Sequence, residues 1–266
     1  MSADLHVHRY GPSGPVQVLT IHGVTEHGQC WELLADRLPE TTIAAPDLLG
    51  HGRSSWAAPW TIDANVSALA ALIDEQADGP VVVVGHSFGG AVALRLSAVR
   101  PDLVSALVLL DPAVGLDGSR VREVVDGMVA FPDYPHPAAA RAEKATGAWA
   151  DVDPAVLDAE LAEHLVVLPN GRYSWRMSLP AMVCYWSELA RDIMLPPAGT
   201  PTTLVRAGRA DPRYVSDELV AALGQRLGAD LVLHEFDCGH MVPQAKPADV
   251  AALIRQHLAT PSPWHR

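Results

Sequence analysis

The chain has 266 residues, of which 49% are hydrophobic and 19% charged, and its formal net charge is −12. This composition supplies a buried core and excludes an intrinsically disordered chain. The acidic balance and the absence of any Lys/Arg cluster exclude nucleic acid as a partner, because a phosphate backbone requires a basic surface.

Apolar runs rich in β-branched residues alternate with helical stretches along the chain. Several runs are continuous, as expected when helices cover both faces of a parallel sheet. The alternation therefore predicts a doubly wound, mostly parallel α/β sheet. The expected strands are 5–9, 16–21, 41–45, 81–84, 106–110, 202–206 and 231–236. The expected helices of the same unit are 30–38, 62–77, 88–99, 214–227 and 247–258.

The strand pattern stops between about Pro112 and Pro197, where Ala, Glu, Asp, Pro and Trp become frequent. The segment is too long for a simple crossover. We expect a helical cap, or lid, at 112–197, inserted between two late strands, with 1–111 and 198–266 forming the core. Expected cap helices are 119–130, 137–149, 154–165 and 179–192.

Three tryptophans of the expected cap, Trp149, Trp175 and Trp186, are candidate substrate-binding residues. Aromatic side chains in such a segment can line an apolar acyl pocket, or they can fill the small core between cap and sheet. The sequence does not decide between these two roles.

Cysteines and targeting signals favour a cytoplasmic protein. Cys30, Cys184 and Cys238 are odd in number and far apart, which argues against a disulfide framework. The start of the sequence lacks a basic segment followed by an apolar one, and no apolar run is long enough to span a bilayer.

The nucleophile motif is Gly85-His-Ser87-Phe-Gly89, which follows four valines and precedes an Ala- and Leu-rich stretch. A strand, a sharp turn and a helix are the context that gives G-x-S-x-G its meaning. The turn pushes the serine side chain clear of the sheet, and glycine is required where a Cβ would collide with backbone. We therefore expect Ser87 to be a nucleophile rather than a simple helix cap.

A base for this serine is expected at His240, in the turn after the last strand. Serine is almost never ionised at neutral pH, so it requires a base whose pKa lies near 7. Two acids compete to orient the histidine. Asp211 follows the strand at 202–206 and is preferred for its loop context, while Asp111 directly follows the strand at 106–110 and stays an alternative.

An oxyanion hole is expected from two backbone N–H groups. Phe88, directly after the nucleophile, offers one, and Val24, after the tight turn at Gly23, offers the other. His22 is expected to shape this loop.

The stretch from Asp47 to Ser54 follows another expected strand and contains two glycines. We expect Asp47, His51 and Arg53 to hold a packed turn through internal hydrogen bonds, without a chemical role.

These motifs together resemble the α/β-hydrolase superfamily over essentially the whole chain. The resemblance extends to Ile21-His-Gly23, Gly208-Arg-Ala-Asp211 and Cys238-Gly-His240, and it is similar in style to mycobacterial lipase-like hydrolases. It implies an eight-stranded sheet, a helical cap, no cofactor and an acyl-enzyme intermediate. One departure is that the amino-terminal segment offers one clear strand where the family usually has two, so the first sheet edge is expected to be short.

The function expected from these residues is hydrolysis of small-molecule carboxylic esters by a Ser-His-Asp triad. A thioesterase, a lactonase, a carbon–carbon bond hydrolase or a cofactor-free perhydrolase could use the same triad, and a small-molecule receptor of this fold could retain it with little turnover. No metal is expected, because neither H-E-x-x-H nor a clustered set of His and Asp ligands is visible.

Overall fold

A computed structural model describes residues 4–259 of the chain. Seven strands form the main sheet of this part: β1 (Val7–Tyr10), β2 (Val18–Ile21), β3 (Ile43–Pro46), β4 (Val81–His86), β5 (Val104–Leu110), β8 (Thr202–Ala207) and β9 (Leu231–Phe236). Their order is β1-β3-β2-β4-β5-β8-β9, with β1 antiparallel to β3 and the other pairs parallel. All seven predicted strands are present, and the fold class is confirmed. The resemblance implied eight strands, whereas the main sheet of the described residues has seven. The single clear strand at the amino-terminal end of the sequence indicated this difference.

The α-helices pack on the sheet or lie in the insertion between β5 and β8. They are α1 (Glu32–Ala35), α2 (Ile62–Gln76), α3 (Phe88–Val99), α4 (Gly118–Ala130), α5 (Pro137–Thr146), α6 (Pro154–His164), α7 (Leu179–Glu188), α8 (Asp217–Leu227), α9 (Val242–Ala245) and α10 (Pro247–Ala259). Each predicted helix is found, with shifts of a few residues at the ends and with α1 reduced to a single turn after a 3-10 turn.

Two hydrophobic cores lie on opposite faces of the sheet. Side chains alternate along a strand, so Val81 and Val83 of β4 join the core that contains residues of α2, α3 and α8, whereas Val82 and Val84 join the core that contains residues of α1 and α10. All four valines are at most 2% exposed. This double burial explains why the strand is a continuous apolar run.

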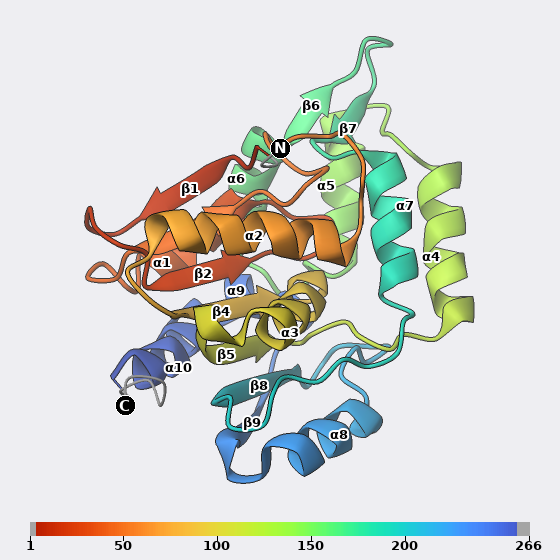
Figure 1. Cartoon of the computed structure of the whole chain (residues 1–266). Coiled ribbons are helices and arrows are strands. Elements are labelled where there is room, and N and C mark those ends of the chain that lie inside the picture. The colour runs from red at the N-terminus through yellow and green to blue at the C-terminus, as the bar shows by residue number, and fades with distance from the viewer. Residues whose placement is uncertain (1–3, 260–266) are drawn as a thin grey trace.

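The insertion contains a hairpin that the sequence analysis missed. Strands β6 (Leu165–Val167) and β7 (Tyr173–Trp175) pair in antiparallel fashion between α6 and α7. Each has only three residues, too few to show an alternating pattern. Figure 1 shows α4, α5 and α7 grouped to one side of the main sheet, with the hairpin projecting beyond them.

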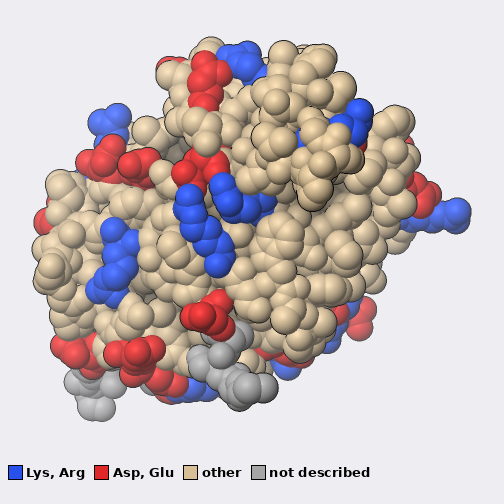
Figure 2. Space-filling view, turned by 90° about the horizontal axis from the view of Figure 1, so that it is seen from above, with Lys and Arg blue, Asp and Glu red and all other residues tan. Residues whose placement is uncertain are grey.

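The surface carries both signs of charge. In Figure 2, Lys and Arg side chains are interspersed with Asp and Glu side chains rather than segregated from them. Among the described residues, no helix combines the length and the apolar character needed to cross a bilayer. Cys30, Cys184 and Cys238 are all free thiols, as predicted.

Candidate active site

Ser87 sits on a strained turn between β4 and α3. Its φ and ψ are 52° and −117°, a region that L residues rarely adopt. The flanking glycines are sterically required: a Cβ on Gly85 would lie 2.4 Å from the carbonyl oxygen of Gly89, and a Cβ on Gly89 would lie 2.1 Å from that of Ile21. The turn therefore has the nucleophile-elbow geometry that the motif predicted.

His240 lies between Ser87 and a buried aspartate. Its Nε2 is 2.9 Å from Ser87 Oγ, and its Nδ1 is 2.6 Å from Oδ2 of Asp111. The second carboxylate oxygen of Asp111 accepts a hydrogen bond from the Ala207 amide at 3.1 Å, and Asp111 is 1% exposed. Hydroxyl, imidazole and carboxylate thus form one continuous hydrogen-bonded line.

The preference for Asp211 as the partner of His240 is wrong, because Asp111 holds that place. Asp211 is exposed and lies four residues beyond the end of β8 at Ala207. Asp111 follows the last residue of β5, the strand beside β4, and its backbone has a φ of 42°. An acid that directly ends the strand next to the nucleophile strand is carried to the same sheet edge as Ser87, and this is the property that distinguishes the two candidates.

Burial keeps His240 in its neutral form. Desolvation is the largest influence and lowers the pKa of His240 below its usual value, while the hydrogen bond to Asp111 opposes the shift. The ring of Tyr214 stacks on the imidazole with centroids 3.9 Å apart and an interplanar angle of 22°. A neutral imidazole with Nδ1 bonded to a carboxylate presents an unprotonated Nε2 to the serine hydroxyl.

The two backbone amides expected to form an oxyanion hole lie at the start of α3 and in the loop after β2. Phe88 is the first residue of α3, so its amide belongs to those that a helix leaves without an internal acceptor. Within residues 4–259, the amide of Val24 has no hydrogen-bond acceptor, and Val24 lines the same cavity as Ser87. His51 Nε2 lies 2.8 Å from the Val24 carbonyl oxygen and anchors this loop.

His22 and Asp47 hold the loops after β2 and β3 through buried hydrogen bonds, as predicted. His22 Nε2 accepts a hydrogen bond from the Leu48 amide at 2.9 Å, and burial lowers its pKa to about 3. Asp47 accepts hydrogen bonds from the amides of Gly28 at 2.7 Å and Arg53 at 2.8 Å.

Glu26 and His86 form a buried pair next to His240. The sequence analysis did not predict this pair. Nδ1 of His86 is 3.0 Å from Oε1 of Glu26, and Nε2 of His86 donates to the carbonyl oxygen of His240 at 2.8 Å. The other carboxylate oxygen of Glu26 accepts the Gly23 amide at 3.0 Å. The pair therefore connects the loop after β2, the end of β4 and the loop that carries His240.

Each member of this pair favours the charged form of the other. Burial alone would raise the pKa of Glu26, but the charge and hydrogen bond of His86 lower it to about 2. Burial would lower the pKa of His86, but Glu26 and the carbonyl of His240 raise it above its usual value. No sequence pattern marks Glu26, whereas His86 lies inside the nucleophile motif.

A cavity of about 550 Å³ opens on Ser87 and His240. Its volume is in the range of small-molecule sites. The three tryptophans predicted as substrate-binding all line it, and each is 5–7% exposed. Other apolar walls come from Val124, Met128, Met177, Leu179 and Met241.

A buried polar contact beside this cavity joins the insertion to His27, in the loop that follows β2. Oε2 of Glu160, on α6, is 2.7 Å from Nε2 of His27. Oε1 of Glu160 accepts a hydrogen bond from Nζ of Lys144 at 2.5 Å. The Lys144 ammonium also lies 4.4 Å from the ring centroid of Trp149 and 4.1 Å from that of Trp175. These contacts fix two of the three tryptophans in place.

The chain belongs to the α/β-hydrolase family: a model of that family matches residues 18–253. It is 79% identical over 258 residues to lipase LipV of Mycobacterium tuberculosis (strain ATCC 25618 / H37Rv), which covers 97% of this chain and 99% of the relative. It is 30% identical over 264 residues to esterase Rv0045c of the same organism, covering 95% and 85% of the two chains. Among solved structures, E-2-(acetamidomethylene)succinate hydrolase aligns with a TM-score of 0.80 at 23% identity, over 96% of this chain and 95% of that one. The resemblance to mycobacterial lipase-like hydrolases is confirmed.

Proposed function

We propose that this chain is a serine hydrolase that cleaves carboxylic esters of small molecules through an acyl-enzyme. The observation that carries the proposal is the unbroken line from Ser87 through His240 to Asp111, which opens into an apolar cavity. The names of its lipase and esterase relatives agree with it.

The geometry supports a two-step reaction. Ser87 Oγ attacks the ester carbonyl while its proton passes to Nε2 of His240, and Asp111 stabilises the imidazolium. The Val24 and Phe88 amides hold the negative oxygen. The imidazolium then protonates the departing alkoxide, which leaves the acyl group on Ser87. A water that gives its proton to His240 attacks the acyl carbonyl, and the imidazolium returns the proton to Ser87 Oγ as the acid leaves.

The two spaces around His240 differ in character, and we assign them to the two halves of the ester. The apolar cavity with the tryptophans suits the acyl chain. A second cavity of about 450 Å³ adjoins it at Tyr214 and His240 and is lined by Arg120, Asp151 and Arg209. This polar space suits the alcohol and the incoming water.

The test combines covalent labelling with a substrate panel. A fluorophosphonate should add once per chain, on the peptide that contains Ser87. Nitrophenyl esters of graded acyl length should be turned over with higher kcat/KM than acyl-CoAs or lactones. A preference for acyl-CoA or lactone would replace the ester assignment, and a ligand-induced thermal shift without turnover would instead indicate a receptor.

The pH profile of kcat/KM should reflect the environment of His240. A general base must be neutral, and burial lowers the pKa of His240 below 6.5. Activity should therefore rise with pH along an acid limb whose midpoint lies below 6.5, and be nearly flat at neutral pH. A midpoint above 6.5 in a steady-state profile with a nitrophenyl ester contradicts this description of the base.

Replacing Trp186 with alanine should move the optimum toward longer acyl chains, because it enlarges the cavity. Trp186 lines the cavity, and within the described residues its Nε1 has no hydrogen-bond partner. The measurement is kcat/KM across acyl lengths together with Tm. Trp31→Leu is the control, since Trp31 is fully buried outside the cavity and should lower Tm without changing the chain-length profile. An unchanged profile in Trp186→Ala would assign Trp186 to packing alone.

A further inference from the structure

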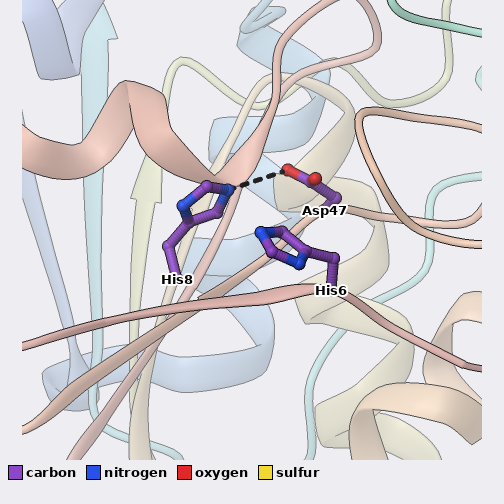
Figure 3. A group of neighbouring side chains, drawn as sticks. All are labelled: His6, His8 and Asp47. Atoms are coloured by element: carbon purple, nitrogen blue, oxygen red, sulfur yellow. Dashed lines mark ion pairs between the residues drawn. The ribbon is translucent and has the colours of Figure 1, made fainter.

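Strand pairing brings two histidines and an aspartate together at the edge of the sheet. His6 and His8 flank Val7 and therefore lie on the same face of the β1 segment. The Asp47 amide donates to the His6 carbonyl oxygen at 2.9 Å, so Asp47, directly after β3, stands across from His6, directly before β1. Figure 3 shows the two imidazoles and the carboxylate turned toward one another.

The three side chains are close enough to share one ion, and the His8–Asp47 pair lies at the spacing of two ligands of one ion. One ligand atom from each of the three residues lies within 4.8 Å of the others. Nε2 of His8 is 3.5 Å from Oδ1 of Asp47, and within the described residues this buried nitrogen has no hydrogen-bond partner. Two ligands bound to a tetrahedral ion at about 2.0–2.1 Å are roughly 3.4 Å apart.

His8 and Asp47 are held in place by the backbone around them. A Cβ at Gly28 would lie 2.8 Å from Cδ2 of His8, so the loop packs directly against this imidazole. Asp47 accepts hydrogen bonds from the amides of Gly28 and Arg53, which fix its carboxylate in place. The partly exposed histidines leave a side open to solvent.

We propose that His6, His8 and Asp47 bind a divalent transition-metal ion of the Zn²⁺, Co²⁺ or Ni²⁺ type, with solvent completing the coordination. Two imidazoles and one carboxylate favour these ions over Mg²⁺ and Ca²⁺, which prefer oxygen ligands. The site lies at the β1–β3 edge and takes no part in the line from Ser87 to Asp111. Its role is structural: the ion joins β1 to the loop that Asp47 organises.

This cluster was not expected from the sequence, which shows no clustered set of His and Asp ligands. The two histidines are separated from Asp47 by about forty residues. The three residues meet only because β1 runs antiparallel to β3, so the cluster depends on a strand register that the sequence analysis did not predict.

The experiment is calorimetric titration of the chelator-treated full chain with ZnCl₂ at pH 7.5. We expect one ion per chain, a rise in Tm with the ion, and a Co²⁺ absorption spectrum typical of nitrogen and oxygen ligands. His8→Gln should weaken Zn²⁺ binding at least about tenfold and abolish the Tm rise, because a ligand is lost. MgCl₂ should give no comparable binding, and lowering the pH to 5 should release Zn²⁺ as the imidazoles take up protons.

The matched control is His234→Gln, which removes a histidine from β9 and leaves the cluster intact. It should bind Zn²⁺ like the unaltered chain. His6→Gln should repeat the effect of His8→Gln, and the Tm of both variants without metal shows that they fold. No stoichiometric binding to the unaltered chain, or full binding in both folded His variants, would overturn the proposal.

Discussion

Asp111→Asn is expected to lower kcat by about 10⁴-fold, the scale found when the equivalent acid of a serine triad is replaced by its amide. The amide can keep the hydrogen bond that Oδ1 accepts from Ala207, so the fold should persist. Its NH₂ group would face Nδ1 of His240 and favour the tautomer with the proton on Nε2. That nitrogen then cannot accept the proton of Ser87.

The control for this variant is Asp211→Asn. Asp211 is the acid that the sequence favoured as the partner of His240. Asp211 is exposed and lines the second cavity, so its amide variant should lower kcat far less than Asp111→Asn does. Both variants should be measured with one nitrophenyl ester at pH 7.5, with Tm recorded for each. A larger loss in Asp211→Asn would show that the contact between His240 and Asp111 is not the one used in turnover.

Glu26→Ala is expected to lower the free energy of unfolding by about 3–5 kcal/mol, the usual cost of breaking a buried ion pair by removing one partner. The change removes the counter-ion of His86 and leaves the Gly23 amide without its acceptor. For a domain of this size, the loss corresponds to a fall in Tm of roughly 6–20 °C. Denaturant unfolding at pH 6 is the direct measurement.

An exposed pair provides the comparison. Glu40 and the guanidinium of Arg255 are 3.3 Å apart, but their side chains are 61% and 50% exposed. Glu40→Ala should therefore cost less than about 1 kcal/mol. If the two alanine variants unfold at the same denaturant concentration, Glu26 and His86 are not a stabilising pair.

The pH dependence of Glu26→Gln should distinguish charge from hydrogen bonding, because glutamine can still accept the Gly23 amide. His86 has a raised pKa in the folded chain, so its contribution is complete below 6.5 and is lost as the pH rises through that raised value. The pKa of Glu26 is lowered to about 2, so its contribution is complete above about 4.5 and is lost as the pH falls toward 2. The stability difference between the unaltered chain and Glu26→Gln should thus be largest between about pH 4.5 and 6.5. A difference that does not vary with pH would mean that the pair is not ionised.

The sheet and its helices could be predicted because their apolar patterns are local. Val81 to Val84 form one continuous run, and both faces of that run are buried. Gly85 could be assigned to the turn for the same reason, since a Cβ there would collide with Gly89 and Gly90 a few residues away. The need for glycine at Gly89 arises instead from the distant backbone of Ile21 and His22, and the motif alone indicated it.

Several contacts between distant segments were not predicted, although the one between Ser87 and His240 was. Asp111 and Asp211 both follow strands of the same sheet, and only the position of β5 beside β4 separates their roles. Glu26 and His86 are sixty residues apart, and neither a repeat nor a spacing rule connects them. The hairpin of β6 and β7 escaped because three-residue strands carry too little periodicity.

The cap and the base are also joined directly. Asp151 of the insertion accepts the backbone amide of Gly239, the residue before His240, at 2.5 Å, and Arg209 lies 3.2 Å from the same carboxylate. Moving the insertion away from the sheet would break the hydrogen bond between Asp151 and the Gly239 amide, which restrains the loop that carries the imidazole. Any movement of the insertion away from the sheet would therefore also remove one restraint on the loop that carries His240.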